Sequence, residues 1–294
     1  PPLITIMNNS SAVSSATDLE YYQGQRIAAL VIAILVSCAG SYIFIVLTVF
    51  EVLVDRPADF MRWLCLAASF LLLWRVAAEF VEIRHGEDSR LVCRHGREFK
   101  TLLQSVIISC IYLVLWIRQR GFYKMEALAR LSNPIIRGLS FSVVIIMAIT
   151  SVSTVVLYFV SRAYTNSARG CVVEWSTIWK LLPGIIYFVS TFLFQIILLG
   201  LMINPIYQHI RTLNTTGISF NRSEPSKEII LVKRVTTATA IAITTDIICG
   251  IVSVFVLTNT YGSSRQLVYD IDMLVSLIVV ICSFSDWRTR LVPF

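Results

Sequence analysis

The chain alternates between long apolar stretches and short polar segments. Apolar runs recur at about residues 27–53, 60–82, 101–117, 138–161, 181–206, 229–257 and 267–284. A membrane-crossing helix needs about 20 mostly apolar residues, because each residue adds about 1.5 Å toward a hydrocarbon core of about 30 Å. The pattern therefore predicts an all-α membrane protein, built as a bundle of seven transmembrane helices.

The polar segments divide the chain into three parts. Residues 1–25 form a tail rich in Ser and Asn, for which we predict little regular structure. Residues 26–287 make up the seven-transmembrane domain, and residues 288–294 form a short end. An odd number of spans places the two termini on opposite sides of the membrane.

The basic residues predict which side is which. Lys and Arg are enriched in the cytoplasmic loops of membrane proteins, and the count favours an extracellular tail and a cytoplasmic C-terminal end. Asn8 and Asn9 begin overlapping N-x-S tripeptides, which would carry glycan on an outside tail. Asn214 and Asn221 begin two further acceptor tripeptides that would be glycosylated only in the opposite orientation. The residues alone leave that conflict open.

Composition narrows the class of protein. Of the 294 residues, 56% are hydrophobic and 15% are charged, and the net charge is +7. The basic residues lie at the ends of apolar runs, where membrane topology explains them, so we expect no nucleic-acid partner. We expect contacts with membrane lipids, anionic lipids included, and a multi-pass location in the plasma membrane.

The sequence offers little for an enzyme. Its three histidines are His85 and His95 in a predicted outer loop and His209 at a predicted inner helix end. None lies inside a span, where a membrane hydrolase would hold zinc, and no Gly-rich phosphate loop is present. We therefore predict no enzymatic activity and no cofactor.

Two of the seven cysteines stand apart from the rest. Cys93 and Cys171 lie in predicted loops, whereas the other five lie within apolar runs, where cysteine packs as a small apolar residue. Both loops face the same side in either orientation. A bond between them would persist only in an oxidising compartment, and two unrelated thiols remain the alternative.

These features resemble the rhodopsin-like class of G-protein-coupled receptors. The likeness rests on seven spans, a glycosylatable tail, Cys93 eight residues before the third span and Cys171 before the fifth. It implies a Cys93–Cys171 disulfide and makes Arg118 the arginine at the inner end of the third helix. However, Ile117 precedes Arg118 where the family has an acid, and the seventh span has no Lys for retinal. The subfamily stays open, a chemosensory group included.

Ionisable residues at bilayer depth suggest where a ligand binds, because such charges are costly and usually have partners. Arg75 and Asp246 have similar predicted depths, so they pair with each other or with a ligand. Alternatively Arg75 reaches Glu79, and Asp246 bonds neighbouring Thr hydroxyls. An acidic mouth at the outer helix ends would favour a cationic ligand, unless it is an ordinary solvated rim. The predicted ligand-binding residues are Arg75, Glu79, Gln104, Asp246, Tyr269, Asp270, Asp272 and Trp175.

The predicted inner surface is basic and bears aromatic residues. It suits anionic lipid headgroups and also an acidic partner such as a G protein. The predicted G-protein contacts are Arg118, Arg120, Phe122, Tyr123, Tyr207, Arg211, Lys233 and Arg234.

The resemblance thus implies a cell-surface receptor that binds an extracellular ligand and signals through a heterotrimeric G protein. Two other functions remain open. One is a seven-span ligand-gated channel of the insect chemoreceptor type, with an inside N-terminus and glycan on Asn214 and Asn221. The other is a transporter of small solutes.

Overall fold

The computed structural model describes most of the chain. The described residues are 2–53, 60–85, 90–122, 134–161, 164–167, 170–173, 186, 189–201, 203, 227–253 and 262–284.

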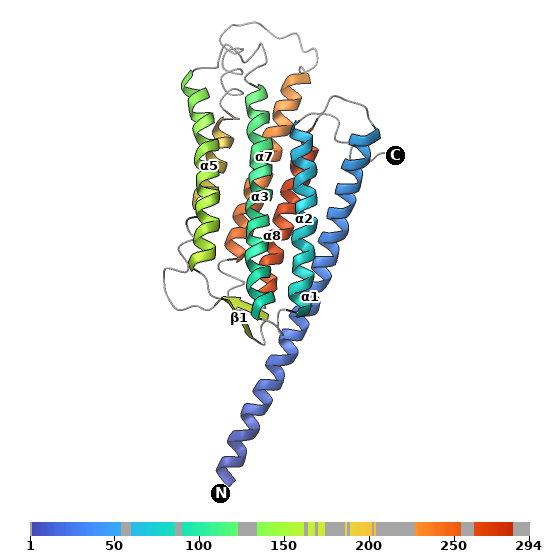
Figure 1. Cartoon of the computed structure of the whole chain (residues 1–294), viewed down its shortest axis with the longest axis vertical. Helices are drawn as coiled ribbons and strands as arrows, with labels where there is room; N and C mark the ends of the chain where they lie inside the picture. Colours follow the sequence, from blue (N-terminus) through green and yellow to red (C-terminus); the bar gives the residue numbers. More distant parts are fainter. Residues whose placement is uncertain are drawn as a thin grey trace.

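Helices that run alongside one another dominate the architecture (Figure 1). They are α1 (Pro2–Leu53), α2 (Phe60–His85), α3 (Arg90–Phe122), α5 (Pro134–Ser161), α7 (Lys227–Ile251) and α8 (Gly262–Cys282), with a further helical segment at Val189–Leu201. The prediction of a helical bundle is confirmed at this level.

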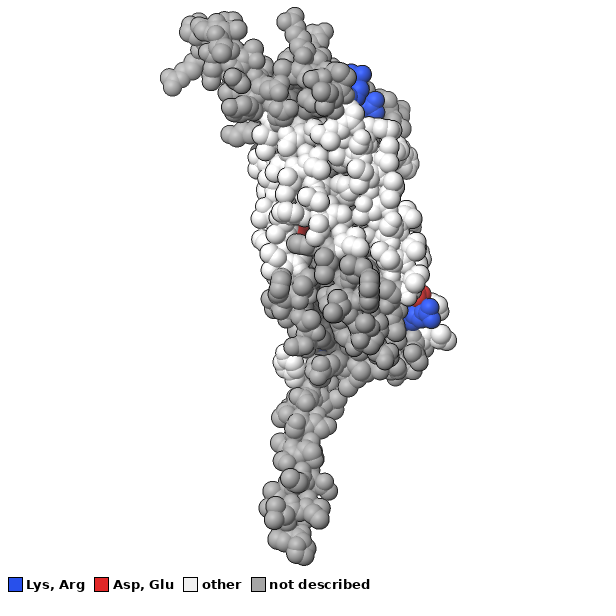
Figure 2. Space-filling view, turned by 90° about the vertical axis from the view of Figure 1, so that its left-hand side faces the viewer, with Lys and Arg blue, Asp and Glu red and all other residues white. Residues whose placement is uncertain are grey.

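Several helices can cross a membrane. Those long and apolar enough are Gln23–Phe50, Phe60–His85, Leu91–Gly121 and Arg137–Val160, and shorter apolar helices cover Val189–Leu201 and Thr236–Ile251. Figure 2 shows a face that is almost uncharged across its middle, with Lys and Arg at its two ends. Such a belt suits a multi-pass membrane protein, whereas the count of seven crossings and the orientation stay predictions.

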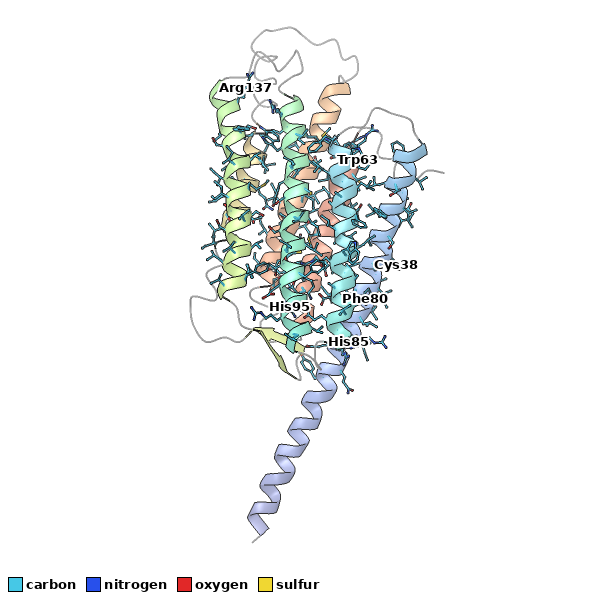
Figure 3. All side chains as sticks on the ribbon, in the orientation of Figure 1. Cys38, Trp63, Phe80, His85, His95 and Arg137 are labelled. Carbon is cyan, nitrogen blue, oxygen red and sulfur yellow. The ribbon has the colours of Figure 1, made fainter. Side chains whose placement is uncertain are left out.

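A two-stranded hairpin is an addition to the predicted all-helical fold. Strand β1 (Tyr164–Ser167) pairs antiparallel with β2 (Gly170–Val173). The hairpin contacts α3 and α8, at the end of the bundle where α2 ends and α3 begins (Figure 1). We call this the hairpin end. His85 and His95 lie there, and Arg137 lies at the opposite end (Figure 3).

The expectation for residues 1–25 is wrong. Helix α1 is continuous from Pro2, and its first half projects beyond the bundle (Figure 1). Once a helix has formed in the apolar part, each added residue gains a backbone hydrogen bond, so a polar composition does not by itself end it. Gly24 is the only glycine in this stretch, and no proline follows Pro2 there. Whether the segment is extracellular remains a prediction.

The start of the third helix also differs from the sequence-based boundary. Helix α3 begins at Arg90 instead of Thr101, so Cys93, Arg97 and Lys100 are helical and do not lie in a loop. The apolar run marked only the part of the helix without charges. The polar first turns of α3 are helical because their charged side chains find partners on α2, as described below.

The core is formed mainly by α1, α2, α3 and α8, and α2 packs most extensively on α3. Leu72, Ile107, Leu277 and Ile281 are almost fully buried at its centre. At Gly40, an added Cβ atom would lie 3.2 Å from Cδ2 of Leu73, so the glycine allows α1 to approach α2 closely. In contrast, α5 exposes Ile145, Ile149, Val152 and other apolar side chains, as expected of a helix that faces lipid.

Candidate functional site

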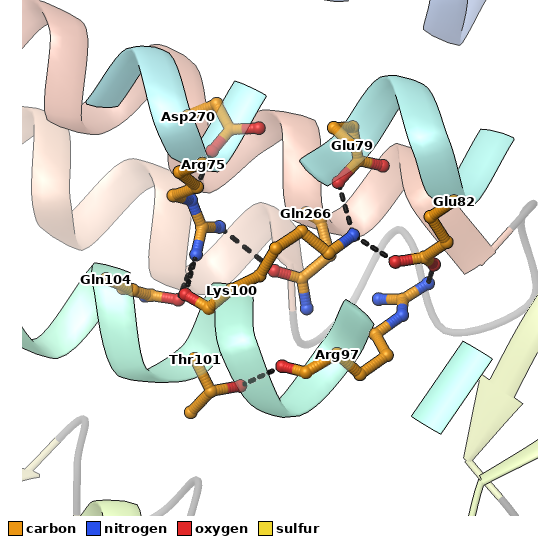
Figure 4. Close-up of polar contacts among 9 residues, drawn as sticks. All are labelled: Arg75, Glu79, Glu82, Arg97, Lys100, Thr101, Gln104, Gln266 and Asp270. Atoms are coloured by element: carbon orange, nitrogen blue, oxygen red, sulfur yellow. Dashed lines mark hydrogen bonds and ion pairs between the residues drawn. The ribbon is translucent and has the colours of Figure 1, made fainter. Parts of the chain in front are cut away.

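Six charged side chains are buried together between three helices near the hairpin end (Figure 4). Three are basic and three are acidic, so the formal charges balance. We call them the charge cluster; its members are Arg75, Glu79 and Glu82 of α2, Arg97 and Lys100 of α3, and Asp270 of α8.

Arg75 joins all three helices. Its Nε donates to Oδ1 of Asp270, and its Nη1 donates to the backbone oxygen of Lys100 at 2.6 Å. Nη1 also reaches Oε1 of Gln104 at 3.3 Å, and Nη2 donates to Oε1 of Gln266 at 3.0 Å. All three guanidinium nitrogens therefore have partners, which offsets the cost of burying the charge.

The other members connect α2 to α3. Nζ of Lys100 pairs with carboxylate oxygens of both Glu79 and Glu82. Arg97 Nη2 lies 2.6 Å from Oε1 of Glu82. The residues on each helix are three apart, so they share one helical face, and the acidic face of α2 meets the basic face of α3. These matching pairs of opposite sign are the signal that sequence reasoning missed for Arg97 and Lys100.

The predicted partners of Arg75 were wrong. Arg75 pairs with Asp270 and not with Asp246, and Glu79, the alternative partner, pairs with Lys100. The pairing of Asp246 with Arg75 was predicted from their similar depth along the bundle. Depth does not specify which side of its helix a residue faces, and that decides which side chains meet. The predicted acidic mouth, whose acids were Glu79, Glu82, Asp270 and Asp272, is also wrong. Glu79, Glu82 and Asp270 are buried in ion pairs, and Asp272 is buried beside Asp246.

Asp246 belongs to a second polar group farther along the bundle. Its Oδ2 accepts a hydrogen bond from Tyr112 Oη at 3.0 Å and another from Gln195 Nε2. Gln195 Nε2 also lies 2.6 Å from Tyr112 Oη. Asp246 does not bond the neighbouring threonine hydroxyls, since Thr244 and Thr245 donate to carbonyls of their own helix.

Asp272 of α8 completes this group. It is 8% exposed, and its carboxyl group lies within hydrogen-bonding reach of that of Asp246. We call Asp246 and Asp272 the acid pair. Asp270 and Asp272 are two residues apart on one helix, so they face different sides of α8, one toward the charge cluster and the other toward the acid pair.

The acid pair lines a small cavity between α3, the segment Val189–Leu201, α7 and α8. Its volume is about 20 Å³, room for about one water molecule. Six side chains give the cavity its polar lining, and isoleucine, leucine, alanine and methionine side chains supply the rest. The polar residues are Tyr112, Gln195, Thr239, Asp246, Asp272 and Ser276.

The structure divides the predicted ligand-binding residues between these two places. Arg75, Glu79, Gln104 and Asp270 take part in the network of the charge cluster, whereas Asp246 and Asp272 line the cavity. Tyr269 is half-buried on α8. Trp175 lies outside the described residues. Sequence reasoning did not single out Tyr112 and Gln195, because one polar residue on an apolar helix carries little signal.

At the end opposite the hairpin, Arg118 of α3 contacts the end of α8. Its Nη2 donates to the backbone oxygen of Ser283 at 2.6 Å and its Nη1 to the Ser283 hydroxyl. The guanidinium carbon lies 4.3 Å from the centre of the Phe284 ring. These contacts link the inner end predicted for the third helix to that of the seventh.

The other predicted G-protein contacts are only partly described. Arg120 lies over the Trp116 ring at 5.6 Å, and Arg234 is half-buried on α7. Tyr123, Tyr207 and Arg211 lie outside the described residues, as do the side chains of Phe122 and Lys233. A shared binding surface of these residues therefore stays a prediction.

The cysteines and the glycosylation sites can be followed in part. Cys38, Cys65, Cys110, Cys249 and Cys282 are not disulfide-bonded. Cys93 is fully buried and disulfide-bonded, whereas the side chain of Cys171 lies outside the described residues, so the Cys93–Cys171 pairing stays a prediction. Asn8 and Asn9 lie on the projecting part of α1, and their side chains are outside the described set.

Comparison with known proteins bears on the fold. No protein-family model matches the chain, and no curated protein matches it. The crystal structure of squid rhodopsin superimposes with a TM-score of 0.60, over 92% of this chain and 84% of that one, at 11% sequence identity. The chain therefore has a rhodopsin-like, seven-transmembrane type of fold. At this identity the likeness concerns the fold alone.

Proposed function

We propose that the chain is a plasma-membrane receptor that binds an extracellular ligand between its helices and signals through a heterotrimeric G protein. The observation that carries the proposal is the rhodopsin-like fold over 92% of the chain. One fold can host several functions, so the receptor role is the proposal and the likeness supports it only through the fold. No group of three or more His, Cys, Asp or Glu side chains that could hold a metal occurs among the described residues.

The cavity beside the acid pair is the proposed ligand site. Pockets for small molecules are mostly apolar and contain a few converging polar groups, as this cavity does. Its present volume is too small for an organic ligand, so binding requires α7 or the segment Val189–Leu201 to move outward. Asp246 reports such a move, because it joins α7 to both Tyr112 of α3 and Gln195.

The charge cluster has a different role in this proposal. Its basic and acidic members form ion pairs with one another, so little unpaired charge is left for a ligand to contact. It instead fixes α2, α3 and α8 together, so that movement on ligand binding falls mainly on α7 and its neighbours. A ligand then changes the balance between two arrangements of the bundle by binding one more tightly.

Arg118 offers the test of coupling to a G protein. Arg118→Ala removes the contacts with Ser283 and Phe284 and also a predicted partner contact. We expect nucleotide exchange on co-expressed G proteins to fall about tenfold or more while surface expression stays near that of the wild type. This corresponds to the loss of roughly 1.4 kcal/mol of interaction with the partner.

A matched control is Arg120→Ala, which removes a neighbouring arginine that lies over Trp116. We expect it to have a smaller effect than Arg118→Ala. If both variants signal like the wild type, Arg118 has no coupling role. If a panel covering every G-protein class gives no exchange with the wild-type chain and a range of ligands, the receptor proposal fails.

Glycan mapping separates the receptor from the channel. Glycan on Asn8 or Asn9 places the projecting part of α1 outside, as the receptor requires. Glycan on Asn214 or Asn221 places it inside and favours the channel, which should also assemble as an oligomer around a pore. Replacing each asparagine by glutamine and following the shift in electrophoretic mobility distinguishes the two outcomes.

A further inference from the structure

The acid pair poses an electrostatic problem that the charge cluster does not. Two carboxyl groups lie within hydrogen-bonding reach of each other, inside helices of a membrane protein. Two ionised carboxylates at this distance repel each other strongly unless a proton or a cation lies between them. Acidic residues at membrane depth are costly and commonly mark a path or a binding site for an ion or substrate.

No basic side chain of the described residues is recorded next to this pair. Asp246 receives hydrogen bonds from the neutral Tyr112 and Gln195, and Ser276 and Cys249 lie beside the carboxyl groups. The three basic members of the charge cluster are held by their own carboxylates. Among the described residues, no basic side chain is therefore recorded that would balance negative charge on the acid pair.

One oxygen of the pair is left without a donor. Oδ1 of Asp272 is buried and accepts no hydrogen bond from the described residues, and Asp272 lines the cavity. A buried oxygen that accepts no hydrogen bond has lost its hydration without compensation, unless a donor or a cation in the cavity contacts it. The unpartnered oxygen belongs to a buried side chain that lines the cavity, so it indicates a missing positive group or donor there.

We propose that the acid pair binds one monovalent cationic group in this cavity, contacted by Asp246, Asp272 and the hydroxyl oxygens of Tyr112, Thr239 and Ser276. The chemistry of the lining is that of a hard, oxygen-coordinated cation or of a small ammonium group. A divalent ion fits less well, because the site offers only two carboxylates and Ca²⁺ takes about six to eight oxygen ligands.

The cation can come from two sources. A sodium ion fits the present volume of about 20 Å³. The ammonium group of a small organic ligand requires the cavity to open, and this source rests on the proposed receptor function. Both share the same contacts with Asp246 and Asp272, so the experiment has to separate them.

The test measures thermal stability of the purified full-length chain in nanodiscs of uncharged lipid. Sodium chloride, methylammonium chloride and the chloride of the bulky cation N-methyl-D-glucamine are compared at equal ionic strength and pH. A bound cation stabilises the folded state by mass action, so we expect Tm of the wild type to be higher by about 2 °C or more in one of the small cations.

The two sources give different results in this assay. A larger rise with sodium identifies the inorganic ion, and a larger rise with methylammonium identifies an organic ammonium group. We expect Asp246→Asn and Asp272→Asn to lose the rise. Glu98→Gln is the matched control, because it removes a carboxylate from α3 far from the cavity lining, and it should keep the rise in full.

Two results overturn the proposal. One is a wild-type Tm that is the same in all three salts, as expected if the acid pair simply shares a proton. The other is a rise that both asparagine variants retain. If the variants do not fold, direct binding to the wild type decides: labelled sodium or methylammonium bound at about one per chain supports the site, and no binding overturns it.

Cation binding and G-protein activation can be lost independently of each other. A chain that activates a G protein but shows no response to small cations loses only the cation site. A chain that binds a cation but activates no G protein keeps the cation site and loses the receptor proposal.

Discussion

The charge cluster and the acid pair place ionisable side chains inside the same bundle, but they treat the charge differently. In the charge cluster, three basic and three acidic side chains from α2, α3 and α8 pair with one another. In the acid pair, two carboxyl groups from α7 and α8 line a cavity, and their hydrogen-bond partners are neutral. A balanced group can hold helices together, whereas an unbalanced one is suited to an additional charged partner.

The two groups also predict that two parts of the bundle differ in how easily their helices move. Helices α2 and α3 share the largest packing interface and most of the buried ion pairs. Helix α7 packs mainly on α8, and a polar link from α7 to α3 runs through Asp246 and Tyr112. We therefore expect the α2–α3 part to resist movement and the α7 part to yield when a ligand binds.

Breaking the charge cluster should have the largest effect on stability. Arg75→Met leaves Asp270 buried without its ion-pair partner, and loss of one member of a buried pair costs about 3–5 kcal/mol. We expect a large fall in Tm of the purified protein, or failure to reach the surface.

The double variant Arg75→Met with Asp270→Leu is the control for this prediction. It removes both charges, so a substantial part of the lost stability should return. If Arg75→Met alone unfolds at the wild-type temperature, the cluster contributes no stability and the comparison between the two groups fails.

A change in the second group should have a moderate effect. Tyr112→Phe removes the hydroxyl that contacts Asp246 and Gln195 but keeps the ring. We expect a loss of about 0.5–1.5 kcal/mol, together with a change in the potency of any activating ligand. Denaturation of the purified protein and G-protein activation measure the two effects.

Ser142→Ala serves as the matched control for Tyr112→Phe. Its exposed hydroxyl donates only to a carbonyl of its own helix. Stability and ligand potency should both be close to those of the wild type. Equal effects of the two changes would mean that the link between α3 and α7 has no special role.

The smallest effect is expected for an ion pair outside the bundle interior. Arg94 and Glu98 pair at 2.9 Å, but the Arg94 side chain is 60% exposed. Exposed pairs at this helical spacing contribute about 0.3–0.5 kcal/mol, and Arg94→Ala should lower Tm by little. A loss as large as that of Arg75→Met would show that burial does not explain the importance of the charge cluster.

The sequence predicted the coarse architecture because apolar length has a direct physical meaning in a membrane. Runs of about 20 apolar residues can satisfy their backbone only as helices there, which is why α2, α5 and α8 lie close to their predicted positions. The same reasoning misplaced the start of α3, because it excluded Arg97 and Lys100 as too polar. It also missed the helical part of α1 before residue 26, where the composition is polar.

The candidate site was predictable only in part. The cost of intramembrane charge drew attention to Arg75 and Asp246, whereas Asp270 and Asp272 were predicted to lie in an acidic mouth. All four have a buried or partly buried place in the bundle. It could not decide which of them meet. Tyr112 and Gln195 gave no signal, because a neutral polar residue at one helical position becomes informative only when its neighbours on other helices are known.

The sequence by itself determined that the chain forms apolar helices and that several carry charges which need partners, since both follow from transfer free energies of single residues and short runs. The tertiary structure alone decided that Arg75 meets Asp270. It also decided that Asp246 and Asp272 meet with no basic side chain of the described residues recorded beside them. The reason is that such contacts depend on the rotation and the neighbours of each helix, which a one-dimensional pattern of polarity does not specify.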